Sequence, residues 1–238
     1  MDALTFSALF TLLILCLALL ARVFDHRITL AAVLGCTIYL VLDDLVTGLP
    51  HLVTTLDLLP GAWNWSGKLL SIGLAFAVIK MLRIPRTAVG LNRPQNGPGV
   101  VIGAVLGFVI WGVVLGYYFR PGQPDAETLL YQSTMPGFAE ELAYRGIAPS
   151  ILLGQVRHRS THGGIPWVVI CLTAAVFGIW HALQVTDGRL HLDMVPELIP
   201  FLGSLPGGYL RFRTNSLWVP IACHGAANLA FHAVGGLL

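Results

Sequence analysis

The residues best suited to chemistry in this chain are two adjacent glutamates, Glu140 and Glu141, with Arg145 one helical turn later in an apolar stretch. A charged side chain at the centre of a membrane helix costs about 2.5–3.5 kcal/mol on insertion scales, so such charges need partners in protein or water. Residues four apart share a helix face, which lets Glu141 pair with Arg145. Glu140 is rotated by about 100° from Glu141. The spacing therefore predicts that the arginine holds one carboxylate and leaves the other free to act.

Three more polar residues lie on separate apolar segments downstream of the acid pair. His181 ends the stretch that begins at Phe177, and His224 and Asn228 lie one helical turn apart on a later segment. Buried polar side chains in hydrocarbon need mutual hydrogen bonds, and a single shared pocket would supply them. A structural ion pair and two packing histidines are the plainer interpretation. Two carboxylates facing one arginine fit that interpretation poorly.

The residue types in this predicted pocket favour hydrolysis. A carboxylate in an apolar site becomes a better general base near neutral pH, and a histidine can help it to deprotonate water. A second histidine and an asparagine amide can donate hydrogen bonds to a developing oxyanion. A divalent metal such as zinc, held by Glu140, His181 and His224, is also feasible by ligand type.

Nucleophilic and zincin-type catalysis fit the sequence less well. Ser133, Thr134 and Ser150 flank the acid motif, but none of them lies in a Gly-x-Ser-x-Gly elbow. No His-Glu-x-x-His pair occurs on one predicted helix. The remaining histidines have no partner motif, and we expect them in loops or at interfaces, although His232 could share the face of His224. These are His51, His158, His162, His191 and His232.

Composition identifies a membrane protein. Only 11% of the 238 residues are charged, against about 25% in a soluble domain, and the mean hydropathy is +0.75. A net charge of +2 without a basic run argues against a nucleic-acid partner. The N-terminus lacks a basic region and a cleavage site, so we interpret it as a retained span. Four cysteines in apolar stretches are expected to be free, buried thiols: Cys16, Cys36, Cys171 and Cys223.

Hydropathy predicts an all-α, polytopic bundle of about eight transmembrane helices around a polar cavity. Region 43–66 is expected to be a long loop, with an interfacial helix anchored by its tryptophans. Gly103, Gly107, Gly112 and Gly116 repeat at helical spacing and predict close packing of their span on a neighbour, with a dimer face as the alternative. The predicted spans are 3–21, 28–42, 67–82, 99–119, 126–155, 164–183, 194–210 and 216–237.

Basic residues predict the orientation of these spans. They gather in alternate loops, which places both termini outside and the basic loops in the cytoplasm. The intervening loops are acidic, and Lys68, Arg120 and Arg189 are their few basic residues. The basic loops hold Arg22, Arg27, Lys80, Arg83, Arg86, Arg93, Arg157, Arg159, Arg211 and Arg213.

The order of the polar motifs resembles a known family. Glu-Glu-x-x-x-Arg at 140–145, Phe-x-x-x-His at 177–181 and His-x-x-x-Asn at 224–228 are similar, in order, to the motifs of the CPBP (ABI, CAAX protease and bacteriocin-processing) intramembrane proteases. The resemblance covers about residues 130–232. It divides the chain into variable N-terminal spans, 1–120, and a catalytic core, 121–238. Type II CAAX prenyl endopeptidases are among these relatives.

The resemblance implies an intramembrane endopeptidase that acts on a membrane-associated, prenylated or hydrophobic peptide. Glu140 and His181 would activate water, and His224 and Asn228 would stabilise the oxyanion. Glu141, Arg145 and Phe177 would support them. The family does not decide metal dependence, so no cofactor is certain. It implies a multi-pass protein of the bacterial cytoplasmic membrane, and the oligomeric state stays open. Two alternatives remain: a transporter or proton relay that uses the Glu, His and Arg cluster, and a non-catalytic scaffold of the same fold.

Overall fold

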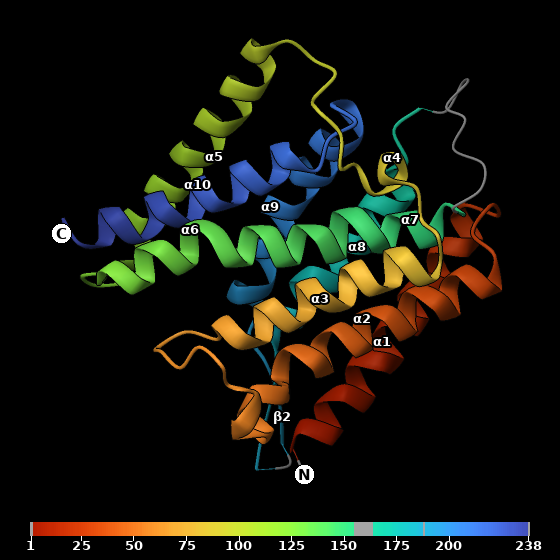
Figure 1. Ribbon diagram of the computed structural model, residues 1–238, viewed down its shortest axis with the longest axis horizontal. Coiled ribbons are helices and arrows are strands. Elements are labelled where there is room, and N and C mark those ends of the chain that lie inside the picture. The colour runs from red at the N-terminus through yellow and green to blue at the C-terminus, as the bar shows by residue number, and fades with distance from the viewer. Residues whose placement is uncertain (1, 155–163, 188, 238) are drawn as a thin grey trace.

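Long helices form most of the chain in the computed structural model, which describes residues 2–154, 164–187 and 189–237 (Figure 1). The α-helices are α1 (Asp2–Phe24), α2 (Leu30–Leu52), α3 (Trp65–Met81), α4 (Arg86–Val89), α5 (Pro98–Phe119), α6 (Ala126–Glu141), α7 (Ala148–Leu152), α8 (Trp167–Ala182), α9 (Met194–Arg213) and α10 (Trp218–Gly235). A π turn, Leu142–Ile147, joins α6 to α7, and a short 3-10 helix spans Thr54–Leu56. Strands β1 (Leu183–Thr186) and β2 (Arg189–Leu192) form an antiparallel hairpin.

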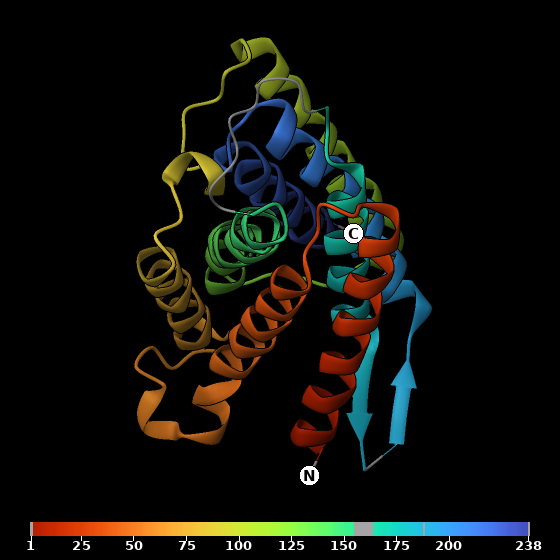
Figure 2. The same cartoon turned by 90° about the vertical axis from the view of Figure 1, so that its right-hand side faces the viewer.

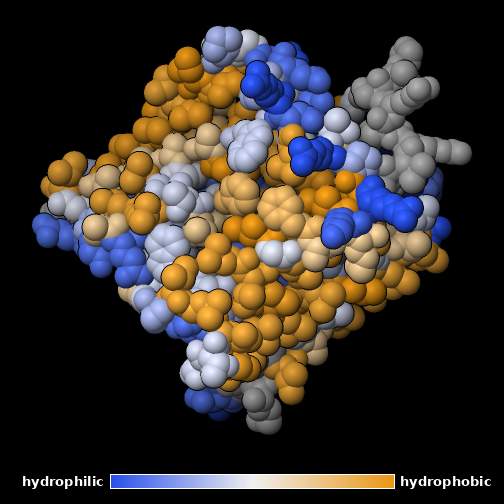
Figure 3. All heavy atoms as spheres, viewed as in Figure 1, coloured by the Kyte–Doolittle hydropathy of each residue, from blue (hydrophilic) through white to orange (hydrophobic). Residues whose placement is uncertain are grey.

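The prediction of a helical membrane fold is confirmed. Among the described residues, three helices are long and apolar enough to cross a membrane, namely α1 over Leu4–Phe24, α2 and α5. Side chains such as Ile38 on α2 and Ile110 on α5 are more than half exposed, as lipid-facing residues are. Figure 3 shows hydrophobic residues spread over the face of the molecule that is viewed in Figure 1. Each of the other predicted spans overlaps a helix, but these helices do not meet the same length and hydropathy criteria.

A central rod formed by α6, the π turn and α7 carries the acid motif. Helices α2 and α3 pack on one side of it, and α10 packs on the other side. Helix α5 packs against α10. Helices α8 and α9 pack against each other, and α8 also contacts α1. Figure 2 looks nearly along the rod, with the other helices arranged around it. The rod therefore touches both the N-terminal and the C-terminal helices, and its side chains can meet partners from either.

Glycines set the close approach of α10 to its neighbours. A Cβ on Gly112 or Gly116 of α5 would meet the carbonyl oxygens of Ala227 or Phe231. The predicted close packing is therefore confirmed for this pair. Gly103 and Gly107 have no atom within 4 Å of such a Cβ, so the first half of the glycine repeat does not take part in the contact.

The predicted loop 43–66 is wrong over its first ten residues. Helix α2 continues to Leu52 and includes Asp43, Asp44 and Pro50. The aspartates fit a helix because both accept hydrogen bonds from other helices: Asp43 from Ser71 at 2.6 Å and Asp44 from Trp180 at 2.7 Å. The sequence pattern treats acids and proline as helix breaks, because it takes no account of hydrogen-bond donors that lie far away in the sequence.

The tryptophans of this region also differ from expectation. Trp65 begins α3 and Trp63 lies in the loop just before it, rather than on an interfacial helix. They donate hydrogen bonds to Glu127 and Thr128 on α6, respectively. They tie the loop before α3 to the first turn of the central rod.

The four cysteines are free, as predicted. Only Cys36 and Cys223 are buried, whereas Cys16 and Cys171 lie on exposed helix surfaces, so the expected burial is wrong for two of them. The basic residues Arg157 and Arg159, like His158 and His162, lie outside the described residues.

Candidate active site

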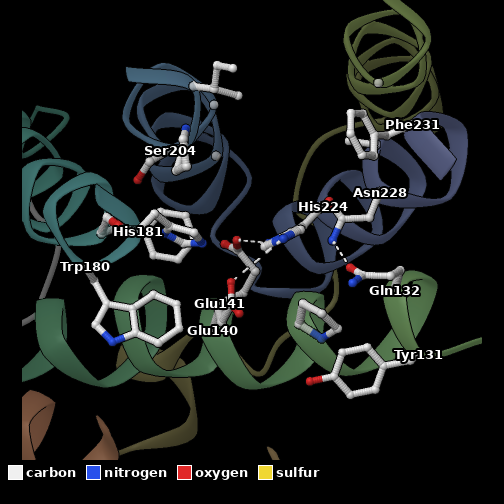
Figure 4. A pocket seen from close by; sticks show the side chains of 18 of the residues that line it. Tyr131, Gln132, Glu140, Glu141, Trp180, His181, Ser204, His224, Asn228 and Phe231 are labelled. Carbon is white, nitrogen blue, oxygen red and sulfur yellow. Dashed lines mark hydrogen bonds and ion pairs between the residues drawn. The ribbon is translucent and has the colours of Figure 1, made fainter. Parts of the chain in front are cut away.

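A cavity of about 780 Å³ lies beside the central rod, and polar side chains gather at one part of its wall (Figure 4). Helices α2, α3, α5, α6, α8, α9 and α10 all contribute to the lining. The structure brings together every residue of the predicted site. Those residues are Glu140, Glu141, Arg145, Phe177, His181, His224 and Asn228.

The acid motif lies where α6 changes into the π turn. Glu140 and Glu141 end α6, and Arg145 lies within the turn. One Glu141 oxygen is 3.2 Å from Nη1 of Arg145, and both side chains are almost fully buried. The predicted pair between these two residues is confirmed. Single π turns inside α-helices are frequent at functional sites, because they displace the following side chains from their regular positions.

Glu141 has a second partner that the sequence did not indicate. Its Oε1 lies 2.9 Å from Nδ1 of His224. A carboxylate only accepts hydrogen bonds, so this geometry requires the proton on Nδ1 of His224. The same carboxylate therefore orients the histidine and holds the arginine. Nε2 of His224 is left to face the cavity.

Glu140 is not free, contrary to the prediction from spacing. Nζ of Lys68 on α3 lies 2.7 Å from its Oε1, and both side chains are about nine-tenths buried. The other oxygen, Oε2, lies 3.9 Å from Nε2 of His224, which is beyond hydrogen-bond distance. The site thus holds two cations for two glutamates. The sequence places Lys68 among the loop residues. A single lysine at the start of a short apolar segment is the signal that could have identified it as part of the site.

His181 is fixed by its own helix. Its Nδ1 lies 2.8 Å from the carbonyl oxygen of Phe177, and since a carbonyl only accepts, Nδ1 carries the proton. A neutral His181 therefore presents the lone pair of Nε2. The Phe177 ring lies between functional groups: the His181 ring is 4.5 Å away, centroid to centroid, and the Arg145 guanidinium is 4.5 Å from its centroid. Phe177 thus contacts both groups, and its supporting role stays a prediction.

Asn228 follows His224 by one turn of α10. Its Nδ2 donates a hydrogen bond to Oε1 of Gln132 on α6, at 3.2 Å. An amide nitrogen has two hydrogens, so one of them remains for another acceptor. Gln132 lines the cavity and was missed because a single glutamine carries no motif.

Other cavity residues were also missed or misplaced. Asp44 and Trp180 line it, joined by the hydrogen bond from the indole described above. His51 and His232 line it as well, although both were expected in loops or at interfaces. His191 lies on the exposed strand β2 rather than in a loop.

The arrangement does not fit the metal site that ligand type made feasible. No group of three or more His, Cys, Asp or Glu side chains within 2–154, 164–187 and 189–237 is placed to hold a metal ion. The Lys68 ammonium already contacts Glu140, and a second cation on that carboxylate would be repelled. We derive no step through a metal.

Comparison with known proteins matches this part of the chain to one family. The family model of Rce1-like type II CAAX prenyl endopeptidases covers residues 122–230. This segment is similar to the Rce1-like family. The Rce1-like segment contains the acid motif and both histidine motifs, in agreement with the predicted resemblance to CPBP intramembrane proteases. Helices α1 to α5 lie outside it. Searches of curated proteins and of solved structures gave no match.

Proposed function

We propose that this chain is an intramembrane endopeptidase that hydrolyses a peptide bond in a membrane-associated, prenylated or hydrophobic peptide. The convergence of Glu140, His181 and His224, from three helices, on one cavity carries the proposal. The Rce1-like match supports a protease of the CAAX type. We also propose that all eight predicted spans cross the membrane, and that this is the bacterial cytoplasmic membrane.

Water is the nucleophile in this proposal. Oε2 of Glu140 is the oxygen that Lys68 does not occupy, and it faces the cavity near His224. Nε2 of His181 offers a second acceptor, because its Nδ1 proton is directed to Phe177. A water held between these acceptors loses a proton to Glu140 as its oxygen attacks the substrate carbonyl carbon.

His224 and Asn228 are suited to the oxyanion that forms. The Nδ1 proton of His224 is directed to Glu141, so a donor at Nε2 requires the imidazolium form. The hydrogen bond to the Glu141 carboxylate holds the ring in this orientation. The free N–H of Asn228 supplies a second donor one helical turn away. Positioned donors of this kind stabilise the tetrahedral intermediate more than the substrate.

Collapse of the intermediate completes the proposed reaction. The C–N bond breaks, and the leaving nitrogen takes the proton that Glu140 removed from water. The products are a new carboxylic acid and a new amine, with no net proton change at the site.

The rest of the cavity is suited to an apolar substrate. Its walls include Trp111 and Phe119 of α5, Ile199 of α9 and Phe231 of α10. A lipid-like or hydrophobic side chain bound along these walls would leave its peptide bond near the polar residues. A transporter and an inactive scaffold are not favoured, because the matched family is a protease family.

Cleavage of a prenylated peptide by the purified protein in detergent tests the proposal. Glu140→Ala and His224→Ala should each lower kcat/KM by about 10²–10⁴-fold, as removal of a general base or an oxyanion donor does. His191→Ala, on the exposed hairpin, is the matched control. Cleavage by both cavity variants at the wild-type rate would refute the assigned site. A wild type inactive on prenylated and unprenylated hydrophobic peptides would refute the function.

A further inference from the structure

We infer that Lys68 is a positioning residue for hydrolysis: it keeps Glu140 ionised and fixes Oε1, so that Oε2 is the oxygen that acts on water. The inference deepens the proposed function and rests on it. It gives the N-terminal half of the chain, outside the Rce1-like segment, a direct part in the site.

The position of Lys68 is set by the fold rather than by its neighbours in sequence. It lies in the first turn of α3, where Asn64 caps the helix by accepting from the backbone N–H of Gly67. Asn64 also donates to the carbonyl of Thr47 on α2, at 2.9 Å. These contacts hold the start of α3 against α2. The lysine side chain then extends toward α6, where only 8% of its surface is exposed.

The ion pair with Glu140 is specific among several acids nearby. Asp43 accepts from Ser71 and Asp44 from Trp180, so each aspartate has a neutral donor of its own. The ammonium of Lys68 contacts Glu140 at 2.7 Å and lies 5.6 Å from the centroid of the Trp180 ring. The ring face adds a weaker attraction for the cation.

Charged and titratable groups on five elements face Glu140 or Lys68, and any effect of pH includes them. They are Asp43 and Asp44 on α2, Tyr131 on α6, Tyr144 in the π turn, His181 on α8 and His224 on α10.

Two consequences follow from the short contact. An ammonium beside a carboxylate in a poorly solvated site favours the ionised form of the acid, which a general base requires. The contact also uses Oε1, and only Oε2 remains on the side of His224. A structural salt bridge between α3 and α6 would affect folding alone. In the role inferred here, Lys68 also affects the protonation of Glu140 and the direction in which its Oε2 points.

The test compares Lys68→Met and Lys68→Arg with wild type, and Lys80→Met is the matched control. Lys80 lies in the last turn of the same helix and is exposed. In the peptide-cleavage assay, Lys68→Met should lose about 10²-fold or more in kcat/KM at neutral pH. The acidic limb of its pH profile should move to higher pH by about 1–3 units. An adjacent positive charge lowers the pKa of an acid by about this amount, and the substitution removes that charge. Lys68→Arg should retain the wild-type limb, and Lys80→Met should match wild type throughout.

A second measurement does not depend on cleavage. A hydrophobic carbodiimide reacts with protonated carboxyls, and peptide mass spectrometry measures its attachment to Glu140 in the intact protein. Lys68→Met should be labelled at neutral pH several-fold faster than wild type, and Lys68→Arg should not. Faster labelling with no cleavage by any protein would refute the proposed function, and with it a role of Lys68 in hydrolysis, while still showing that Lys68 keeps Glu140 ionised. Unchanged labelling and an unchanged pH profile in Lys68→Met would overturn the inference, whatever its thermal stability.

Discussion

The substitution Glu141→Gln tests how the buried charges support one another. Glu141 is 2% exposed and contacts Arg145 at 3.2 Å and Nδ1 of His224 at 2.9 Å. Glutamine has the same shape but lacks the negative charge. The substitution therefore leaves Arg145 buried without its counter-ion, and it replaces the carboxylate that positions the His224 ring with a neutral amide.

Coulomb's law gives the size of the effect. Two unit charges 3.2 Å apart attract by about 5 kcal/mol at an effective dielectric constant of about 20. Removal of one partner from a buried pair costs about 3–5 kcal/mol in measured cases, which is consistent. At about 2–4 °C per kcal/mol for a chain of this size, the unfolding midpoint should fall by about 10 °C. Activity should fall by a further 10²–10³-fold, because the His224 ring loses the charge-assisted hydrogen bond that positions it for the oxyanion.

Thermal unfolding and peptide cleavage in the same detergent measure both effects. The double variant Glu141→Gln/Arg145→Met removes both charges of the pair, so it should recover much of the midpoint but little of the activity. Glu127→Gln, outside the cavity lining, is the control for loss of a glutamate. A Glu141→Gln protein as stable and as active as wild type would refute the reasoning on both charges.

Three further predictions concern the oxyanion, the helix packing and the metal. Asn228→Ala should lower kcat by about 10²–10³-fold in the cleavage assay, whereas Gln132→Ala, which removes only the acceptor of Asn228, should cost less; equal losses would contradict the assignment of the amide as the donor. Gly112→Val should lower the unfolding midpoint, because its side chain would meet the backbone of α10, and Gly103→Val should not, since that position is open; equal midpoints would contradict the packing described. Incubation with a chelator should leave cleavage within about twofold of its starting rate, given that Lys68 contacts the would-be ligand Glu140; a loss that added zinc restores would show that a metal takes part.

The general plan of the protein could be predicted from sequence because its physical basis is local. Apolar runs must form helices in lipid, since every backbone polar group needs an internal partner there. All eight predicted runs overlap helices, and the Glu141–Arg145 pair follows from helical periodicity alone. The ends of α2 and the hairpin β1–β2 were missed, because the hydrogen bonds that stabilise them depend on contacts that hydropathy does not describe.

The sequence by itself determined which residue types could do chemistry: an acid pair, two histidines and an amide, each on an apolar segment whose burial requires partners. Only the tertiary structure decided which partners those are. Lys68 reaches Glu140 across 72 residues, Gln132 reaches Asn228 across 96, and Asp44 reaches Trp180 across 136. Single residues such as these carry no periodic signal, and their charges and amides acquire a role only where helix packing brings them within hydrogen-bond distance.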